Sequence, residues 1–468
     1  MSNDNTTDEL KIFELSLIWK EAEYNFAFWE WLSDTLDWDK AYRAALSAIL
    51  ATTNLYEYYL ELMKFAALLR DGHTRVWFPQ SINDSPEYTS KLPIATHLIG
   101  GERVITNVKR IAADKVKRWS VIKKVDGLGM KEYAEKYIYP YIWHEKKDSA
   151  DFWIDRFLSN GAAGSEAELV LEYEGATETV VLTRTKGDTD WFYNNTISKL
   201  NESPRQIYQS DSHRITMTED DIAIISIDTM MNDKLPDEFY ANLPLFEKAR
   251  GYVIDVRNNG GGNSTNSDAV AAAFIEGEFT NQRSLHPIHI GAYKAWGRNM
   301  QFGDKTYEQV IAEHGASDWI EKTYKITKRR YYEDSTSTSN RNNCPGVLTA
   351  PLVVLTSPNT ASAAEDFLIE LDCNNRATII GSASYGSTGN PLTFELESGG
   401  GFQICTRHNL YPDGREFINT GVKPHIPFEM TLDDYKNGVD SVMNKGLEVV
   451  RGLLTMRTVI HSGFGSEA

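Results

Sequence analysis

Apolar residues in the first part of the chain recur at helical spacing. Between residues 8 and 70 they are separated by three and four positions, as in Leu60, Met63 and Ala67. No proline interrupts this pattern before Pro79. The pattern therefore predicts an N-terminal helical segment, residues 1–77, whose helices end near the glycine of the sequence D-G-H-T at 71–74.

The pattern changes to that of short strands between residues 92 and 186. Apolar runs flank two glycine-containing turns, Asp126-Gly127 and Glu174-Gly175, and a helix-like stretch, K-E-Y-A-E-K-Y, lies between them. Two apolar runs on either side of a short turn of this kind predict a β-hairpin. We expect a small β-rich domain here, followed by a polar linker over 187–218.

From residue 219 onward, apolar strands alternate with helices. The predicted strands are I-A-I-I-S-I, Y-V-I-D-V, P-L-V-V-L-T and A-T-I-I-G, and helices follow the second and the third. This rhythm is typical of an α/β core with a parallel sheet, here residues 219–468. A polar and aromatic stretch at 284–345 interrupts it, and a long insertion of this kind is often a lid or binding loop.

Composition narrows the classes of function. The 468 residues include 48 basic and 66 acidic side chains, for a net charge of −18, which argues against a nucleic-acid partner. No apolar run is long enough to span a membrane. The polar, acidic start has no signal-peptide pattern, which predicts a cytoplasmic protein if that start is native and a periplasmic or extracellular one if a leader was removed. Three scattered cysteines suggest neither a disulfide framework nor a metal site.

Ser362 lies where a buried strand gives way to an alanine-rich helix. Backbone N–H groups in the first turn of a helix have no intrahelical partner, so they can stabilise an oxyanion that forms beside a nucleophile. The alternative is that Ser362 only caps the helix. The glycines at 260–262 likewise follow a buried strand and fit either an oxyanion hole or a tight turn. They do not have the spacing of a phosphate-binding loop.

A serine nucleophile needs a general base, and histidine is the usual one. Of the ten histidines, His73 lies at the end of the helical segment beside Gly72, where it can project from a loop. A lone histidine is more often structural than catalytic. His408 and His425 are nearer to Ser362 in the sequence and remain alternatives.

Four segments in this order resemble the C-terminal processing (tail-specific) peptidases and the tricorn-core proteases. They are D-G-H-T at 71–74, Y-V-I-D-V-R-N-N-G-G-G at 252–262, V-V-L-T-S-P-N-T-A-S-A-A-E at 353–365 and D-G-R-E-F-I-N-T-G-V-K-P-H at 413–425. The resemblance implies an α/β, crotonase-like (ClpP-like) catalytic core with an inserted PDZ-like domain at 92–186. It also implies that Ser362 is the nucleophile and that Gly260 or Gly261, together with Ala363, forms the oxyanion hole. No cofactor and no metal are implied.

The resemblance also indicates which residue acts as the general base. One branch of the family uses a lysine beyond the nucleophile, but Ser387 stands at that position and no lysine occurs from 363 to 422. The tricorn-like branch uses a histidine at the position of His73, with a serine beside it where this chain has Gly72. Ser387 is therefore a candidate to replace that serine.

The tricorn-like branch orients its histidine with a glutamate. The position that matches is Ile418, which cannot do this, and Glu416 would share its face of a strand. We therefore expect Glu416 to orient His73, and Asp71, two residues from the histidine, to point away.

The predicted function is hydrolysis of peptide bonds by a serine endopeptidase. The substrate would be a peptide or protein bound as an extended strand, and an oligomer is compatible with the sequence. Two other classes are a silent ligand-binding protein on the same scaffold and an acyl-CoA enzyme of the crotonase superfamily. The joint presence of Ser362, His73 and the glycine loop favours the peptidase.

Overall fold

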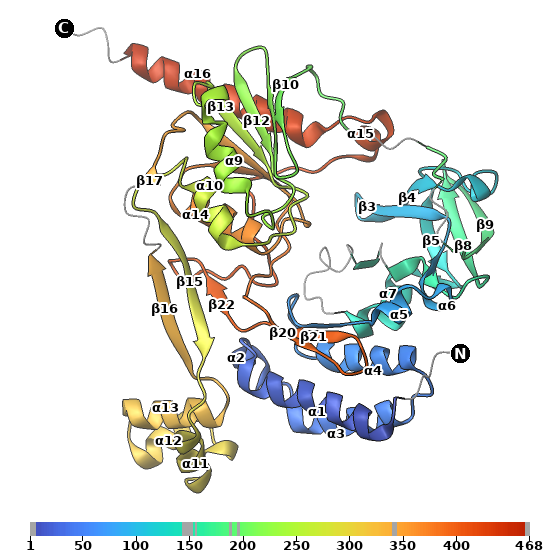
Figure 1. Ribbon diagram of the computed structural model, residues 1–468, viewed down its shortest axis with the longest axis vertical. Coiled ribbons are helices and arrows are strands. Elements are labelled where there is room, and N and C mark those ends of the chain that lie inside the picture. Colours follow the sequence, from blue (N-terminus) through green and yellow to red (C-terminus); the bar gives the residue numbers. More distant parts are fainter. Residues whose placement is uncertain are drawn as a thin grey trace.

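A seven-stranded sheet organises the larger part of the molecule in this computed structural model, which describes residues 6–142, 153–154, 157–186, 190–193, 197–338 and 344–463 (Figure 1). The strands β12, β13, β18, β19 and β23 are parallel, and β10 and β11 extend the sheet in antiparallel fashion. In sheet order the bounds are β10 Arg205–Gln209, β11 Arg214–Met217, β12 Ile222–Ser226, β13 Gly251–Asp255, β18 Leu352–Thr356, β19 Thr378–Gly381 and β23 Ile426–Pro427.

Helices cover both faces of this sheet, because alternate residues of each buried strand point to opposite sides. Val253 and Val353 pack with the apolar face of α16 (Ser441–Gly463), whereas Ile254 and Val354 belong to the core on the other face. That second face is covered by α9 (Leu235–Ala241), α10 (Ser264–Ala271) and α14 (Ala363–Cys373) (Figure 1). The chain therefore has the mixed α/β architecture expected from its strand and helix pattern.

The N-terminal segment is helical, as predicted, but it forms separate helices. These are α1 (Asp8–Asn25), α2 (Trp29–Leu32), α3 (Trp38–Leu50) and α4 (Leu55–Ala67). The side chains of Thr7, Asp37 and Asn54 cap α1, α3 and α4 by accepting from backbone N–H groups, which explains where these helices begin. The helices share one apolar core with the larger sheet. A small sheet, β1 (Arg75–Trp77), β21 (Gly401–Ile404) and β20 (Leu392–Glu395), joins the end of this segment to the C-terminal half of the chain.

The region at 92–186 forms a β-rich unit with a core of its own. Its antiparallel strands are β3 (Ile94–Ile99), β4 (Glu102–Val108), β5 (Val121–Val125), β6 (Leu128–Gly129), β8 (Glu166–Tyr173) and β9 (Ala176–Thr183), with helix α7 (Met130–Tyr137). The hairpins predicted at Asp126-Gly127 and Glu174-Gly175 are both present. Within 187–218, where we expected a linker, residues 205–209 and 214–217 are β10 and β11, because pairing with β12 gives their backbone groups partners.

Of the stretch 284–345 that interrupts the α/β pattern, residues 284–338 belong to an arm. Its two long strands, β15 (Thr280–Pro287) and β16 (Tyr332–Thr338), carry a helical tip of α11 (Gly291–Asn299), α12 (Tyr307–His314) and α13 (Asp318–Thr327), and β22 (His408–Leu410) pairs with β15 (Figure 1). The arm is fixed to α1, since Lys294 and Arg329 both form ion pairs with Glu23.

The remaining elements are short. They are α5 (Gln80–Asn83), α6 (Pro86–Thr89), α15 (Leu432–Asn437) and the strand pairs β2 (Ser90–Lys91) with β7 (Asn160–Gly161) and β14 (Glu276–Gly277) with β17 (Cys344–Pro345). Among the helices described, none is both long and apolar enough to cross a membrane.

Candidate active site

Ser362 occupies the sharp turn between strand β18 and helix α14. It immediately precedes α14 with φ 54° and ψ −125°, a left-handed conformation that is rare for a residue with a side chain. Such a conformation costs on the order of 1–3 kcal/mol and is usually kept only where it positions a functional group. The serine is half-buried, and the N–H of the next residue, Ala363, lies at the first helical position, where the helix itself offers no acceptor.

The glycine loop packs directly against this turn. A Cβ placed on Gly261 would lie 2.5 Å from Ser362 Cβ, 2.6 Å from the Ala361 carbonyl oxygen and 3.0 Å from Ala363 N, and its φ of +96° also requires glycine. The Gly261 N–H donates to Asn259 Oδ1 at 2.9 Å. Of the two glycines predicted for the oxyanion hole, Gly261 has its N–H engaged within its own loop and provides the close approach.

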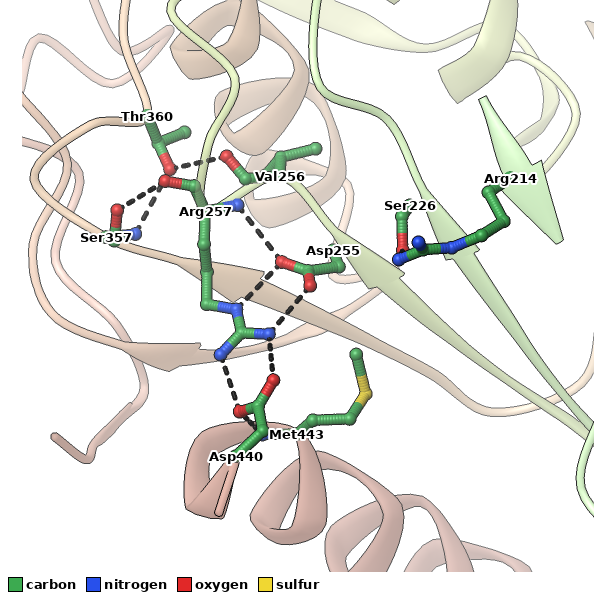
Figure 2. A network of polar contacts seen from close by, with 9 residues as sticks. All are labelled: Arg214, Ser226, Asp255, Val256, Arg257, Ser357, Thr360, Asp440 and Met443. Atoms are coloured by element: carbon green, nitrogen blue, oxygen red, sulfur yellow. Dashed lines mark hydrogen bonds and ion pairs between the residues drawn. The ribbon is translucent and has the colours of Figure 1, made fainter. Parts of the chain in front are cut away.

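Side-chain hydrogen bonds hold the two loops together. Thr360 Oγ1 donates to the Val256 carbonyl oxygen at 2.8 Å, and Ser357 Oγ donates to that of Arg257 at 2.5 Å (Figure 2). The Arg257 guanidinium binds the carboxylates of Asp255 and Asp440 through two hydrogen bonds each, at 2.6 to 2.9 Å (Figure 2). The start of α16 is thereby tied to the strand that carries the glycine loop.

His73 reaches the site from the loop after α4, and its main partner is Ser387. The imidazole Nδ1 and the Ser387 hydroxyl form a short hydrogen bond. The Ser387 carbonyl oxygen also accepts the Ser362 N–H at 3.1 Å, so one residue contacts both predicted catalytic residues. No direct hydrogen bond joins Ser362 Oγ to His73 in the part of the chain that the structure describes. Hydrogen bonds of this kind are often long before substrate binds.

Gly72 explains how Ser387 comes so close to the histidine. A Cβ on Gly72 would lie 2.9 Å from Ser387 Oγ and 2.7 Å from Tyr385 Cε1. The space beside His73 where a neighbouring serine would project is therefore occupied by the hydroxyl of Ser387. Burial lowers the pKa of His73 to about 4, and the positive charge of Arg75 acts in the same direction. The imidazole is thus neutral near pH 7 and able to accept a proton.

Asp71 points inward, contrary to expectation. Its Oδ2 accepts the His73 N–H at 3.1 Å and the Thr74 hydroxyl at 2.7 Å, so it fixes the backbone of the histidine loop. Burial raises the pKa of Asp71 to about 6, although the hydrogen bonds from Thr74 and His73 oppose this rise. These hydrogen bonds lie within the turn at 71–74, and they direct the Asp71 carboxylate towards the backbone of His73.

Glu365 is a buried residue that the sequence analysis did not single out. Its carboxylate accepts from the N–H groups of Ser362, Gly386 and Ser387 at 2.7 to 3.1 Å and from the Ser384 hydroxyl at 2.5 Å. It therefore joins the nucleophile turn to the Ser387 loop. Burial raises the pKa of Glu365 to about 7, even though these hydrogen bonds favour the charged form. The spacing of serine and glutamate is that of a capping box, a signal visible in the sequence.

Glu416 does not contact His73 among the described residues. Its Oε2 lies 3.0 Å from His408 Nε2, and its side chain is 45% exposed. The expectation assumed a strand at 416–418, but residues 414–417 are irregular and 418–420 form a turn, so strand alternation does not apply. The nitrogen assigned to Glu416 is held instead by Ser387.

The two alternative histidines have partners of their own. His408 is buried on β22 against Phe28 and Trp31 and contacts Glu416. His425 accepts the Ile379 N–H and contacts Asp372. Among the described residues neither of these two shares a partner with Ser362, whereas His73 shares Ser387 with it.

Comparisons with known proteins find similarity in the α/β part of the chain. Residues 221–428 match the profile of peptidase family S41. A carboxy-terminal-processing protease from Bartonella bacilliformis is 25% identical over 223 residues, 47% of this chain and 40% of that protein. A carboxyl-terminal-processing protease from Synechocystis is 33% identical over 82 residues, 18% of this chain and 19% of that protein. The matches thus span less than half the length of these curated relatives.

Solved structures extend the likeness to nearly the whole chain. Mature CPAF superposes with a TM-score of 0.66 at 14% identity, covering 98% of this chain and 99% of that one. The structure of mature CPAF complexed with lactacystin gives a TM-score of 0.65 at 15% identity, covering 95% of this chain and 99% of that one. At these identities the likeness concerns the fold, including the N-terminal helices and the β-rich unit.

Proposed function

We propose that this chain, whose residues 221–428 match the model of peptidase family S41, is a serine peptidase that cleaves peptide bonds through an acyl-enzyme at Ser362. The observation that carries the proposal is the arrangement around Ser387. This residue accepts the Ser362 N–H and binds His73 Nδ1, beside a glycine loop that packs on Ala363. A serine, a histidine and an oxyanion hole are what acyl transfer to water requires.

The proposed steps follow from these positions. His73 Nε2 takes the proton from Ser362 Oγ as the oxygen attacks the scissile carbonyl carbon. The N–H groups of Ala363 and Gly260 stabilise the tetrahedral oxyanion. Collapse of this intermediate breaks the C–N bond, and the amine leaves with the proton from His73. Water, deprotonated by His73, then hydrolyses the ester and restores Ser362.

Ser387 has the role of a positioning residue. A neutral imidazole can accept from Ser362 only if its proton lies on the other nitrogen, Nδ1. The Ser387 hydroxyl is the group at Nδ1, so it fixes the tautomer and stabilises the imidazolium that forms. Ser387 thereby supplies the serine that the sequence at Gly72 lacks.

The wider architecture fits the same proposal. We assign residues 219–468 to a crotonase-like core and 92–186 to a PDZ-like unit that binds peptide or protein substrates. The nucleophile comes from the core and the base from the N-terminal segment, so both parts are needed for catalysis.

Hydrolysis of internally quenched peptides by wild type and by Ser362→Ala tests the function. We expect cleavage by wild type only, with mass spectrometry locating the cut peptide bond. The Ser362→Ala protein should keep its circular dichroism spectrum. If the purified wild type cleaves no peptide in a broad set, or Ser362→Ala cleaves as fast as wild type, the proposal is wrong. Ligand capture without turnover would point to a binding protein on this scaffold.

A further inference from the structure

A cavity of about 730 Å³ lies between the N-terminal helical segment and the β-rich unit. One wall comes from α4, β1 and the short helices α5 and α6, and the other from α7, residues 138–142, Trp153 and Phe157. Figure 1 shows these elements gathered on the side of the molecule opposite the arm. The volume falls within the range of about 300–1,000 Å³ that is usual for ligand sites.

The lining of the cavity is mainly aromatic. Tyr56 stacks on Tyr88 with ring centroids 4.3 Å apart and on Phe78 at 5.3 Å, so this wall consists of stacked rings. Met63 adds a polarisable side chain that adapts to the shape of an apolar ligand. Other aromatic residues of the lining are Trp77, Tyr137, Tyr141, Trp153 and Phe157. Such a surface favours aromatic and aliphatic groups over charged ones.

One end of the cavity is the candidate catalytic loop itself. Asp71, Gly72 and Tyr385 line it, and they flank His73 and Ser387 in the sequence. The Tyr385 N–H donates to the Thr360 carbonyl oxygen at 2.8 Å, and its hydroxyl accepts from Trp153 Nε1 at 3.1 Å. The cavity therefore borders the two loops that carry His73 and Ser387.

Two buried acceptors on this lining have no hydrogen-bond partner within the described residues. They are Oδ1 of Asp71 and Oδ1 of Asn160. A buried acceptor without a partner is costly, so such an atom usually marks a place where a ligand or water donates. A peptide in the cavity would offer backbone N–H groups to these oxygens, whereas a plain hydrocarbon would not.

We propose that this cavity binds an apolar segment of the peptide substrate, with bulky aromatic or aliphatic side chains. The inference rests on the proposed peptidase function and adds the class of substrate. Specificity then comes from a pocket built jointly by the N-terminal segment and the β-rich unit.

A cavity-filling variant tests this in the full chain. In a series of quenched peptides, one phenylalanine is moved along an otherwise Ala/Ser/Gly sequence, and kcat/KM is compared with that of the parent without phenylalanine. We expect at least one position at which phenylalanine raises kcat/KM about tenfold or more. In Ala67→Trp, where the indole fills the cavity, the peptide with phenylalanine and the parent peptide should have equal kcat/KM. Leu68→Trp is the matched control, because Leu68 is 40% exposed and lies outside the lining.

Crosslinking gives a second measurement that does not need catalysis. The Ser362→Ala protein is irradiated with a peptide carrying p-benzoylphenylalanine at the favoured position, or at each position in turn if none is favoured. We expect adducts on lining residues such as Met63, competed by unlabelled peptide and lost in Ala67→Trp. Adducts confined to residues outside the lining, or an unchanged phenylalanine ratio in Ala67→Trp, would overturn the inference. Cavity adducts without any cleavage by wild type would instead overturn the proposed function alone.

Discussion

At the scale of single residues, Ser387 and Gly72 form a complementary pair. The side chain that one position lacks is supplied by the other, since a Cβ on Gly72 would lie 2.9 Å from Ser387 Oγ. The backbone of Gly72 does not have a positive φ, so a serine is conformationally permitted there once the Ser387 side chain is removed and the Tyr385 ring, 2.7 Å from the added Cβ, shifts aside. The hydroxyl beside His73 can therefore be moved from one position to the other.

This exchange gives the first prediction. Ser387→Gly removes the group at His73 Nδ1 and should lower kcat roughly 10²-fold or more. The double variant Gly72→Ser/Ser387→Gly should recover part of that loss, because only the Tyr385 ring then has to shift, whereas Gly72→Ser alone should stay impaired because it clashes with both Ser387 and Tyr385. Steady-state kinetics checks this. Equal kcat in Ser387→Gly and wild type would show that the hydroxyl does not position the histidine.

The second prediction concerns the pH dependence. Burial and Arg75 lower the pKa of His73 to about 4 from an ordinary 6.5, so the imidazole stays neutral well into the acid range. The acid limb of kcat/KM should therefore have its midpoint nearer 4 than 6.5. Arg75→Ala should move this midpoint upward, because a positive charge that opposes protonation is removed. Arg43→Ala, an exposed site on α3, is the control and should leave the midpoint in place.

The backbone at Ser362 gives a third prediction. Ser362→Ala and Ser362→Gly both remove the nucleophile, but only glycine relieves the cost of φ 54°. Ser362→Gly should therefore be the more stable of the two, by about 1 kcal/mol. Denaturant unfolding of both variants measures the difference. If Ser362→Ala is equally stable, the turn is not strained.

The sequence predicted single residues correctly where both the residue type and its place next to a predicted strand pointed to the same role. Ser362 does lie at a strand-to-helix turn, and the glycine loop does pack beside it. The contacts of Ser387 and Glu365 depend on how distant loops meet, whereas Asp71 points inward because of hydrogen bonds within its own turn. For Glu416, the sequence suggested a strand that does not form.

At the scale of elements, α14 carries a second buried group of carboxylates. Glu370, on its buried face, is close enough to Asp268 of α10 for burial and that charge to raise the pKa of Glu370 well above its ordinary value. The pKa of Asp366, on the same helix, is raised as well, mainly by burial. Glu370 therefore binds a proton more tightly in the folded than in the unfolded chain.

The raised pKa of Glu370 makes the stability of the folded state depend on pH. A raised carboxyl pKa favours the folded state at low pH, and that contribution is lost as pH rises from the unfolded towards the folded pKa. Glu370→Gln removes this dependence. The melting temperature of the variant, relative to wild type, should therefore increase as pH rises from about 4 towards 8. Thermal unfolding across this range measures it, and a constant difference would contradict the assignment.

The strands and helices themselves were largely predictable. Buried parallel strands read as continuous apolar runs, and the two hairpins carry glycine turns. Strands β10 and β11 were not foreseen, because their polar, partly exposed residues resemble a linker until β12 offers an edge to pair with.

At the scale of the whole molecule, the candidate site is assembled from distant parts of the chain. His73 follows the N-terminal helices, the glycine loop and Ser362 belong to the sheet, and Ser387 comes from the loop after β19. The shared apolar core of the helices and the sheet holds these parts in place. Sequence order alone could not give this assembly, whereas the resemblance of four co-linear segments indicated it.

The central claim is that His73 activates Ser362. Its most direct test is the rate at which a fluorophosphonate probe labels wild type, His73→Ala and His408→Ala, with the modified residue mapped by mass spectrometry. The arrangement predicts labelling at Ser362, a rate lowered by several orders of magnitude in His73→Ala, and little change in His408→Ala, whose partners lie elsewhere. Labelling of another residue, or equal rates in His73→Ala and wild type, would contradict it.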